Sequence, residues 1–174
     1  MKRNRTGRME KETHAGVLTV STKGSQGKRR DESGEVAARM LEGEGFSVLK
    51  REVVTDDRER IADTLMEWAD RSGLALILTS GGTGLSPSDV TPQAMEQVID
   101  YQVPGMAEAM RAESLKITPH AMISRATVGV RGSCLIINLP GSPAGVKENL
   151  SVVLPALKHA LSKLGGDPSD CARQ

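Results

Sequence analysis

One short segment constrains the fold more than any other: residues 74–79 have the sequence Leu-Ala-Leu-Ile-Leu-Thr and are apolar almost throughout. A strand with one solvent-facing side alternates apolar and polar residues, whereas a strand covered on both faces in a parallel sheet does not. Two earlier segments also predict a strand followed by a helix, with strands at residues 17–20 and 47–54. Three strand–helix alternations predict a layered α/β fold.

The second half of the chain predicts the remaining elements. Residues 128–130 and 134–139 are apolar and flank an Arg-Gly-Ser turn, which predicts a hairpin whose first strand adds antiparallel at the sheet edge. Helices are expected from Thr91, over residues 106–115, and from Ser142 onward, the last one kinked or restarted at Pro155. The expected fold is therefore a Rossmann-like, three-layer α/β/α structure with a mostly parallel sheet and an antiparallel edge hairpin.

Charge is distributed unevenly along the chain. The net charge is +1, but the first 14 residues hold five Lys and Arg against two Glu, which leaves 18 basic and 20 acidic side chains in the rest. Such a body lacks the basic excess of a nucleic-acid-binding protein, and three aromatic residues are too few for a base-stacking platform. We therefore expect no nucleic-acid partner. We also expect a disordered basic tail over residues 1–14, one domain over residues 15–165, and a flexible C-terminus over residues 166–174.

The sequence also predicts the protein's compartment. Its longest apolar run, residues 74–78, is far shorter than the ~20 residues that cross a bilayer, and no apolar region follows the basic leader. Cys134 and Cys171 are too few for a disulfide framework and fit no metal-ligand spacing, so both are expected to be reduced, with Cys134 in the core. The three histidines share no ligand spacing. These features predict a cytoplasmic protein with no membrane partner.

The strongest local motif directly follows the apolar segment: residues 79–84, Thr-Ser-Gly-Gly-Thr-Gly. Glycines leave backbone N–H groups open, so such a loop can form a concave nest for a phosphate, with the hydroxyls of Thr83 and Ser86 as further donors. The segment lacks the Gly-Lys-Ser/Thr ending of a Walker loop and the third glycine of the dinucleotide fingerprint. The alternative is a tight strand-to-helix connection without a ligand.

Two aspartates are expected beside this loop. Asp56 follows the strand predicted at residues 47–54, and Asp89 follows the glycine-rich loop. Because the carboxyl ends of parallel strands face one crevice, the two side chains are expected to meet there. Two carboxylates beside a phosphate nest suit Mg²⁺, which completes its coordination with water and substrate phosphate oxygens. The alternative is that both aspartates are helix N-caps.

Further turns offer weaker candidates. Residues 139–143, Leu-Pro-Gly-Ser-Pro, predict a second anion site at a helix N-terminus around Gly141 and Ser142, unless Ser142 is a cap and nothing more. Ser33 lies in a third turn at the same sheet edge, where capping alone would explain it. Glu108 and Arg111 are three residues apart on one helix, so they either pair with each other or line a crevice.

Together, these ordered motifs closely resemble the molybdenum cofactor biosynthesis family of the MogA and MoaB type. The resemblance covers about residues 16–164 and rests on six blocks: Asp31 to Gly34, Thr79 to Pro87, Asp89 to Pro92, Pro104-Gly105, Ser124-Arg125, and Leu139 to Pro143. It implies a molybdopterin-binding-like α/β domain that forms homotrimers, which can pair into hexamers.

The resemblance also implies an enzyme, a molybdopterin adenylyltransferase that uses ATP, molybdopterin and Mg²⁺ and releases pyrophosphate. In such a reaction the terminal phosphate of molybdopterin attacks the α-phosphorus of ATP, so positioning and charge neutralisation suffice without a protein nucleophile. The resemblance assigns Asp56 and Asp89 to Mg²⁺ and to catalysis. The implied binding residues are Ser33, Gly81, Gly82, Thr83, Gly84, Ser86, Glu108, Arg111, Gly141 and Ser142.

Two positions depart from the family pattern. Thr22 stands where many relatives have Asp, and Ser88 stands where many have a basic residue, and either change would weaken metal or phosphate affinity. Two alternatives therefore stay open: a non-catalytic member that binds pterin or only assembles as an oligomer, and a nucleotide-binding domain related to the competence-damage proteins. Retention of Asp56 and Asp89 favours the enzyme, because two carboxylates repel a bound phosphate unless a cation lies between them.

Overall fold

A computed structural model describes residues 13–168, and in it the apolar segment forms β3 (Leu76–Ser80), a strand whose five residues are all buried. β3 lies between β1 (His14–Val20) and β6 (Cys134–Leu139) and pairs with both in parallel. The sheet has the strand order β2-β1-β3-β6-β5-β4 and is completed by three further strands: β2 (Ser47–Val54), β4 (Tyr101–Gln102) and β5 (Val128–Arg131).

The two ends of the sheet differ in direction. β2, β1, β3 and β6 are parallel to one another, whereas β5 pairs antiparallel with β6 and β4 pairs antiparallel with β5. β5 and β6 are joined through Gly132, whose φ of +55° suits the tight turn of a hairpin. The predicted mostly parallel sheet with an antiparallel hairpin is confirmed, but the strand at that edge of the sheet is β4, which the sequence did not predict, rather than β5.

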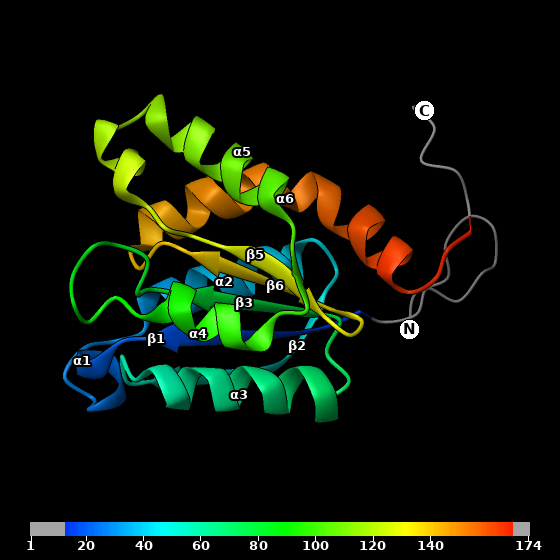
Figure 1. The fold of residues 1–174 in the computed structure, drawn as a ribbon, viewed down its shortest axis with the longest axis horizontal. Helices are drawn as coiled ribbons and strands as arrows, with labels where there is room; N and C mark the ends of the chain where they lie inside the picture. The colour runs from blue at the N-terminus through cyan, green and yellow to red at the C-terminus, as the bar shows by residue number, and fades with distance from the viewer. Residues whose placement is uncertain (1–12, 169–174) are drawn as a thin grey trace.

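Helices cover both faces of the sheet (Figure 1), and successive side chains of β3 point alternately into the two layers of helices. Leu76 and Leu78 pack in one buried cluster with residues of three helices, and Ile77 packs in a second cluster with residues of two others. Figure 1 shows α5 and α6 on one side of the sheet and α3 on the other. The first layer comprises α2 (Glu32–Gly43), α5 (Pro104–Leu115) and α6 (Pro143–Leu164), and the second comprises α3 (Arg58–Arg71) and α4 (Thr91–Val98).

Of the two effects predicted for Pro155, a restart of the helix is wrong, whereas a kink stays a prediction. α6 runs without interruption over 22 residues with Pro155 inside it. Pro155 lies on the exposed side of the helix, where water can hydrate the carbonyl that a missing N–H leaves without a partner, while Val153 and Leu157 are buried on the opposite side. Packing of the apolar side against the sheet therefore holds the helix together past the proline.

Two short helical segments complete the described chain, α1 (Thr22–Ser25) after β1 and the 3₁₀-helix η1 (Pro119–Ile123) after α5. Within residues 13–168, no helix has both the length and the apolar character needed to cross a membrane. β1 begins at His14, and almost all of the tail predicted over residues 1–14 falls outside the described residues, as do Cys171 and most of the predicted flexible C-terminus.

We expect the Cys134 thiol to resist alkylation in the folded protein. Cys134 is 1% exposed, and burial, with a smaller contribution from the charge of Asp70, raises the pKa of its thiol to about 12. At pH 8 iodoacetamide should label Cys134 in a Cys171→Ser variant only after unfolding, which mass spectrometry can measure. The free energy of unfolding should also fall above pH ~8.5, because the exposed thiol of the unfolded chain ionises first. Rapid labelling of the folded protein would contradict this.

Candidate functional site

Four parallel strands end at one edge of the sheet, and the turns that follow them enclose a crevice of about 540 Å³. Chain segments after β1, β2, β3 and β6 contribute to it, as expected for the carboxyl ends of parallel strands. The lining includes seven of the predicted catalytic and binding residues: Ser33, Asp56, Gly81, Gly82, Asp89, Gly141 and Ser142. The structure thus brings together residues that lie up to 109 positions apart in the chain.

Gly81 is the closest point of approach between these turns. Its φ is +106°, and its N–H donates to the carbonyl oxygen of Leu139 at 3.0 Å. A Cβ at this position would lie 2.4 Å from the carbonyl oxygen of Val20, and one at Gly141 would lie 3.3 Å from the Cα of Gly81. The ends of β1, β3 and β6 can therefore meet only where side chains are missing.

Asn138 holds the same turn from within the core, and sequence reasoning missed it. Its Nδ2 donates to the hydroxyl oxygen of Thr79 at 2.8 Å and, at 3.4 Å, to the carbonyl oxygen of Gly81, and the residue is fully buried. The sequence could have indicated this role, because Asn138 is an asparagine inside the apolar segment of residues 134–139, and a buried amide needs hydrogen-bond partners. Asn138 thereby ties β6 to the start of the glycine-rich loop.

Asp56 is not a helix cap. The cap of α3 is its neighbour Asp57, whose carboxylate accepts from the N–H of Arg60 at 2.8 Å. The Asp56 carboxylate instead reaches across to α1, where its Oδ2 accepts from the backbone N–H and from the hydroxyl of Thr22, both at 2.7 Å. Oδ1 of Asp56 accepts no hydrogen bond from the described residues. One oxygen of this half-buried carboxylate is therefore available to a ligand.

Asp89 is not a helix cap either. The N-terminal boundary residue of α4 is Val90, which makes no side-chain cap. Asp89 accepts through Oδ2 from the N–H of Ser86 at 2.9 Å. The guanidinium of Arg125 fixes the loop by donating to the carbonyl oxygens of Gly84, at 2.8 Å, and of Asp89. Arg125 is thus a positioning residue, and the signal for it was the Ser124-Arg125 block.

Capping was the alternative to binding for Ser33 and Ser142, and the structure treats the two residues differently. At α2 the cap is Asp31, whose Oδ1 accepts from the N–H of Gly34 at 2.9 Å, so Ser33 is not the cap. Ser33 is buried in the first turn of α2 and lines the crevice. Ser142 does cap α6 by accepting from the N–H of Gly145 at 3.1 Å, and it also lines the crevice.

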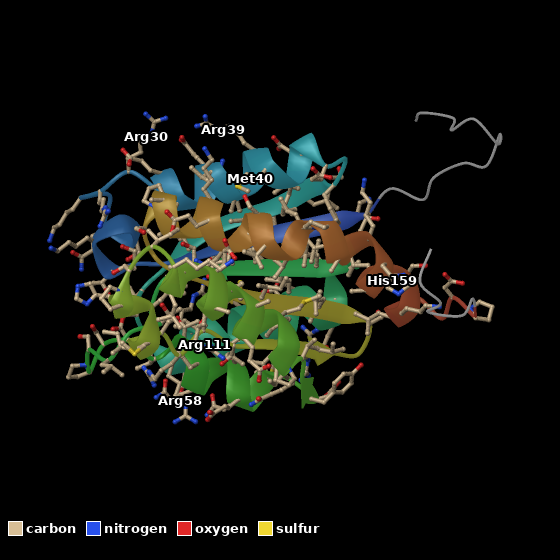
Figure 2. All side chains as sticks on the ribbon, turned by 90° about the horizontal axis from the view of Figure 1, so that it is seen from above. Arg30, Arg39, Met40, Arg58, Arg111 and His159 are labelled. Carbon is tan, nitrogen blue, oxygen red and sulfur yellow. The ribbon has the colours of Figure 1, made fainter. Side chains whose placement is uncertain are left out.

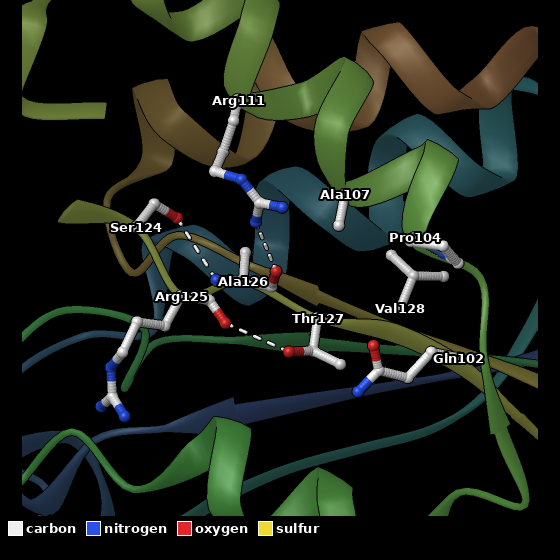
Figure 3. Close-up of a pocket in the computed structure, with 9 residues that line it drawn as sticks. All are labelled: Gln102, Pro104, Ala107, Arg111, Ser124, Arg125, Ala126, Thr127 and Val128. Carbon is white, nitrogen blue, oxygen red and sulfur yellow. Dashed lines mark hydrogen bonds between the residues drawn. The ribbon is translucent and has the colours of Figure 1, made fainter. Parts of the chain in front are cut away.

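The remaining predicted site residues lie elsewhere. Thr83, Gly84 and Ser86 belong to the outer part of the glycine-rich loop and are not among the residues that line the crevice. Glu108 is exposed on α5 and lines neither the crevice nor the second hollow described below. Arg111 lines a second hollow of about 300 Å³ (Figure 3).

Of the two alternatives for Glu108 and Arg111, mutual pairing is wrong, because Arg111 turns away from its own helix. Its Nη1 donates to the carbonyl oxygen of Ala126 at 2.8 Å, the contact drawn in Figure 3. This bond joins α5 to the segment before β5. The second hollow is otherwise lined by residues of that segment, of the start of α5, and of β4 and β5: Ser124, Arg125, Thr127, Pro104, Ala107, Gln102 and Val128.

Three cations at the crevice were also missed: Lys23, Arg29 and Arg30. Arg30 is committed to Glu35 through bonds of 3.0 and 3.1 Å, and this pairing lowers the pKa of Glu35 and raises the pKa of Arg30. Figure 2 shows Arg30 beside Arg39, which also bonds Glu35, and well apart from Arg111. Within the described chain, Lys23 and Arg29 have no ion-pair partner. The sequence feature that could have indicated basic side chains at the crevice is the Lys-Arg-Arg run of residues 28–30, ahead of α2.

Comparison with known proteins decides the family. A family model described as a probable molybdopterin binding domain matches residues 16–159. The chain belongs to this family. As a family member it is 42% identical, over 94% of its length, to gephyrin of Dictyostelium discoideum, and it spans 24% of that protein. It is 38% identical to the molybdopterin adenylyltransferase of Helicobacter pylori, with 88% of this chain and 89% of that protein covered.

A solved structure places the fold in the same family. The molybdopterin biosynthesis enzyme MoaB of Thermus thermophilus superposes with a TM-score of 0.84 at 49% sequence identity, over 91% of this chain and 99% of that one. The predicted family and fold class are thus confirmed.

The glycine requirement at the crevice is testable through stability. Gly81→Ala should lower the free energy of unfolding by at least about 2 kcal/mol, because it adds both an unfavourable φ and a clash with the Val20 carbonyl. Gly43→Ala is the matched control: it lies at the end of α2 with no atom within 4 Å of its Cβ, so stability should stay equal or rise by about 0.5 kcal/mol. Urea unfolding followed by circular dichroism measures both, and a Gly81→Ala protein as stable as the wild type would contradict the account.

Proposed function

We propose that this chain is a molybdopterin adenylyltransferase, which joins the AMP part of ATP to molybdopterin and releases pyrophosphate. One observation carries the proposal: Asp56 and Asp89 line the same crevice as Gly81 and Gly82, and neither aspartate caps a helix. The name of the Helicobacter pylori relative, which this chain covers almost completely, supports the same reaction. Without a cation between them, two carboxylates beside a glycine-lined anion site would repel a bound phosphate.

The described side chains supply positioning and charge, which this reaction requires. An oxygen of the terminal phosphate of molybdopterin forms a bond to the α-phosphorus of ATP, and the bond from that phosphorus to the β-phosphate oxygen breaks, so pyrophosphate leaves with the electron pair. No protein nucleophile takes part. Lys23 and Arg29, which line the crevice as unpaired cations, would balance the charge of the phosphates. The N–H of Gly82, which donates to no other described residue, would bind a phosphate oxygen.

The donor set at the crevice fits Mg²⁺ held jointly with substrate. Among residues 13–168, no group of three or more His, Cys, Asp or Glu side chains could hold a metal by itself. Two carboxylates with a free oxygen suit Mg²⁺, which takes one or two protein carboxylates and keeps water and phosphate oxygens as its other ligands. Asp56 and Asp89 would hold it, and when bound it neutralises charge on the phosphates.

We also propose that the protein is a homotrimer, or a hexamer of two trimers, and that it works in the cytoplasm. Support for self-association comes from large apolar side chains exposed at the end of α5, in η1 and in the connection between them: Leu115, Met122, Ile123 and Ile117. Support for a reducing compartment comes from Cys134, a free and buried thiol.

Substitution of either aspartate tests the function. Asp56→Asn and Asp89→Asn should each lower pyrophosphate release, measured with Mg-ATP and molybdopterin, by about a hundredfold or more. Both variants should fold, because asparagine keeps an oxygen that can accept from Thr22 or from Ser86. Asp57→Asn is the matched control, since it makes the same charge change one residue away and asparagine caps a helix equally well.

The outcomes separate the hypotheses. Release that depends on molybdopterin, with full activity in Asp57→Asn and loss in the two other variants, is the expected result. Full activity in Asp89→Asn would overturn the assignment of the carboxylates. Molybdopterin binding with no release by the wild-type protein would contradict the enzyme and favour a non-catalytic binder, and nucleotide binding without any response to molybdopterin would favour a nucleotide-binding domain.

A further inference from the structure

We propose that Thr22 is a positioning residue that holds one oxygen of Asp56 and thereby presents the other to the cation that accompanies the nucleotide. The inference rests on the proposed function in one respect, that a divalent cation enters the crevice with the nucleotide. It replaces the expectation, drawn from the sequence, that threonine at this position weakens the cation site.

The contact between the two residues has three hydrogen bonds. The hydroxyl oxygen of Thr22 accepts from the backbone N–H of Asp56 at 3.2 Å, so its single proton is directed to Oδ2 of the carboxylate, at 2.7 Å. The backbone N–H of Thr22 donates to the same Oδ2, also at 2.7 Å. These bonds fix the rotation of the Asp56 carboxylate and leave Oδ1 as the oxygen without a donor among residues 13–168.

The fold places Thr22 for this role. Thr22 lies two residues after the end of β1, and Asp56 lies two residues after the end of β2, the neighbouring parallel strand. The N–H of Ser21 donates to the carbonyl oxygen of Val54 at 2.9 Å, and the Ser21 side chain accepts from the N–H of Gly24 at 3.1 Å. The turn that carries Thr22 is therefore anchored to β2 independently of the Thr22 hydroxyl.

The hydroxyl has no packing role that would obscure its effect. Thr22 is exposed and α1 contains no buried residue, so removal of the hydroxyl creates no cavity. An oxygen that already accepts two short hydrogen bonds is a poorer cation ligand than one that accepts none. Asp56 is thus expected to bind a cation through Oδ1 alone, and rotation of its carboxylate is the property that Thr22 controls.

Thr22→Val and Thr22→Ser provide the test, since valine keeps the shape without the hydroxyl and serine keeps the hydroxyl. The probe is Mn²⁺ with α,β-methylene-ATP, an analogue whose α–β linkage cannot be broken, and electron paramagnetic resonance measures the free Mn²⁺. We expect the dissociation constant for Mn²⁺ to rise about tenfold in Thr22→Val and to return to near the wild-type value in Thr22→Ser. Neither the nucleotide affinity measured in EDTA nor the thermal unfolding temperature should change. If Thr22 had only a structural role, Thr22→Val would instead alter one or both of these quantities.

A double variant identifies the partner. In an Asp56→Asn background the valine substitution should cause no further loss of Mn²⁺ affinity, because the carboxylate that Thr22 positions is gone. Turnover should be affected in the same way, with a higher Mg²⁺ concentration needed for half-maximal pyrophosphate release by Thr22→Val and the same rate at saturation.

Failure of this inference is distinguishable from failure of the proposed function. Unchanged Mn²⁺ affinity in Thr22→Val would overturn the role of Thr22 while leaving adenylyl transfer in place. The opposite outcome has three parts: the wild-type protein binds Mn²⁺ and the nucleotide analogue, Thr22→Val weakens the Mn²⁺ affinity, and the wild-type protein transfers nothing to molybdopterin. That outcome would overturn the function while retaining the role of Thr22.

Discussion

The rest of the structure depends on the close approach of three strand ends at Gly81. Because residues 81 and 141 have no Cβ, the chain can turn out of β3 directly beside the carbonyl of Val20 and the turn after β6. Asn138 then fixes that turn from inside the core. The crevice exists at this edge because four parallel strands end there, and the turns that follow those strands place Asp56 and Asp89 in its lining.

Charge at the crevice is divided between groups that build the fold and groups that remain free. Asp31 caps α2 and pairs with Arg51 at 3.6 Å, while Arg30 is committed to Glu35. Asp56, Asp89, Lys23 and Arg29 line the crevice without an ion-pair partner among residues 13–168, and in the proposed function they would act on a bound phosphate. A site with both signs suits a substrate that arrives as a metal–phosphate complex, because the cation needs the carboxylates and the phosphates need the basic side chains.

The fold could be predicted from the sequence because it depends on periodicity, whereas the site depends on contacts between distant residues. The unbroken apolar run of β3 and the motifs at the strand ends predicted the layers, the hairpin and the crevice. Three details could not be predicted in this way. Packing on the sheet overrides Pro155, the side chain of Asp57 rather than Asp56 caps α3, and Arg111 bonds the carbonyl of Ala126 across an element boundary instead of Glu108 on its own helix. Each depends on tertiary geometry that no local spacing encodes.

The most direct test of the account is a crystal structure of the protein with Mn²⁺ and α,β-methylene-ATP, in which anomalous scattering locates the metal. The account predicts a Mn²⁺ peak bound by Oδ1 of Asp56 and by the Asp89 carboxylate, with the phosphates of the nucleotide against Gly82 and Arg29. A metal–nucleotide complex in the second hollow, beside Arg111 and Ser124, with the aspartates unliganded, would contradict it.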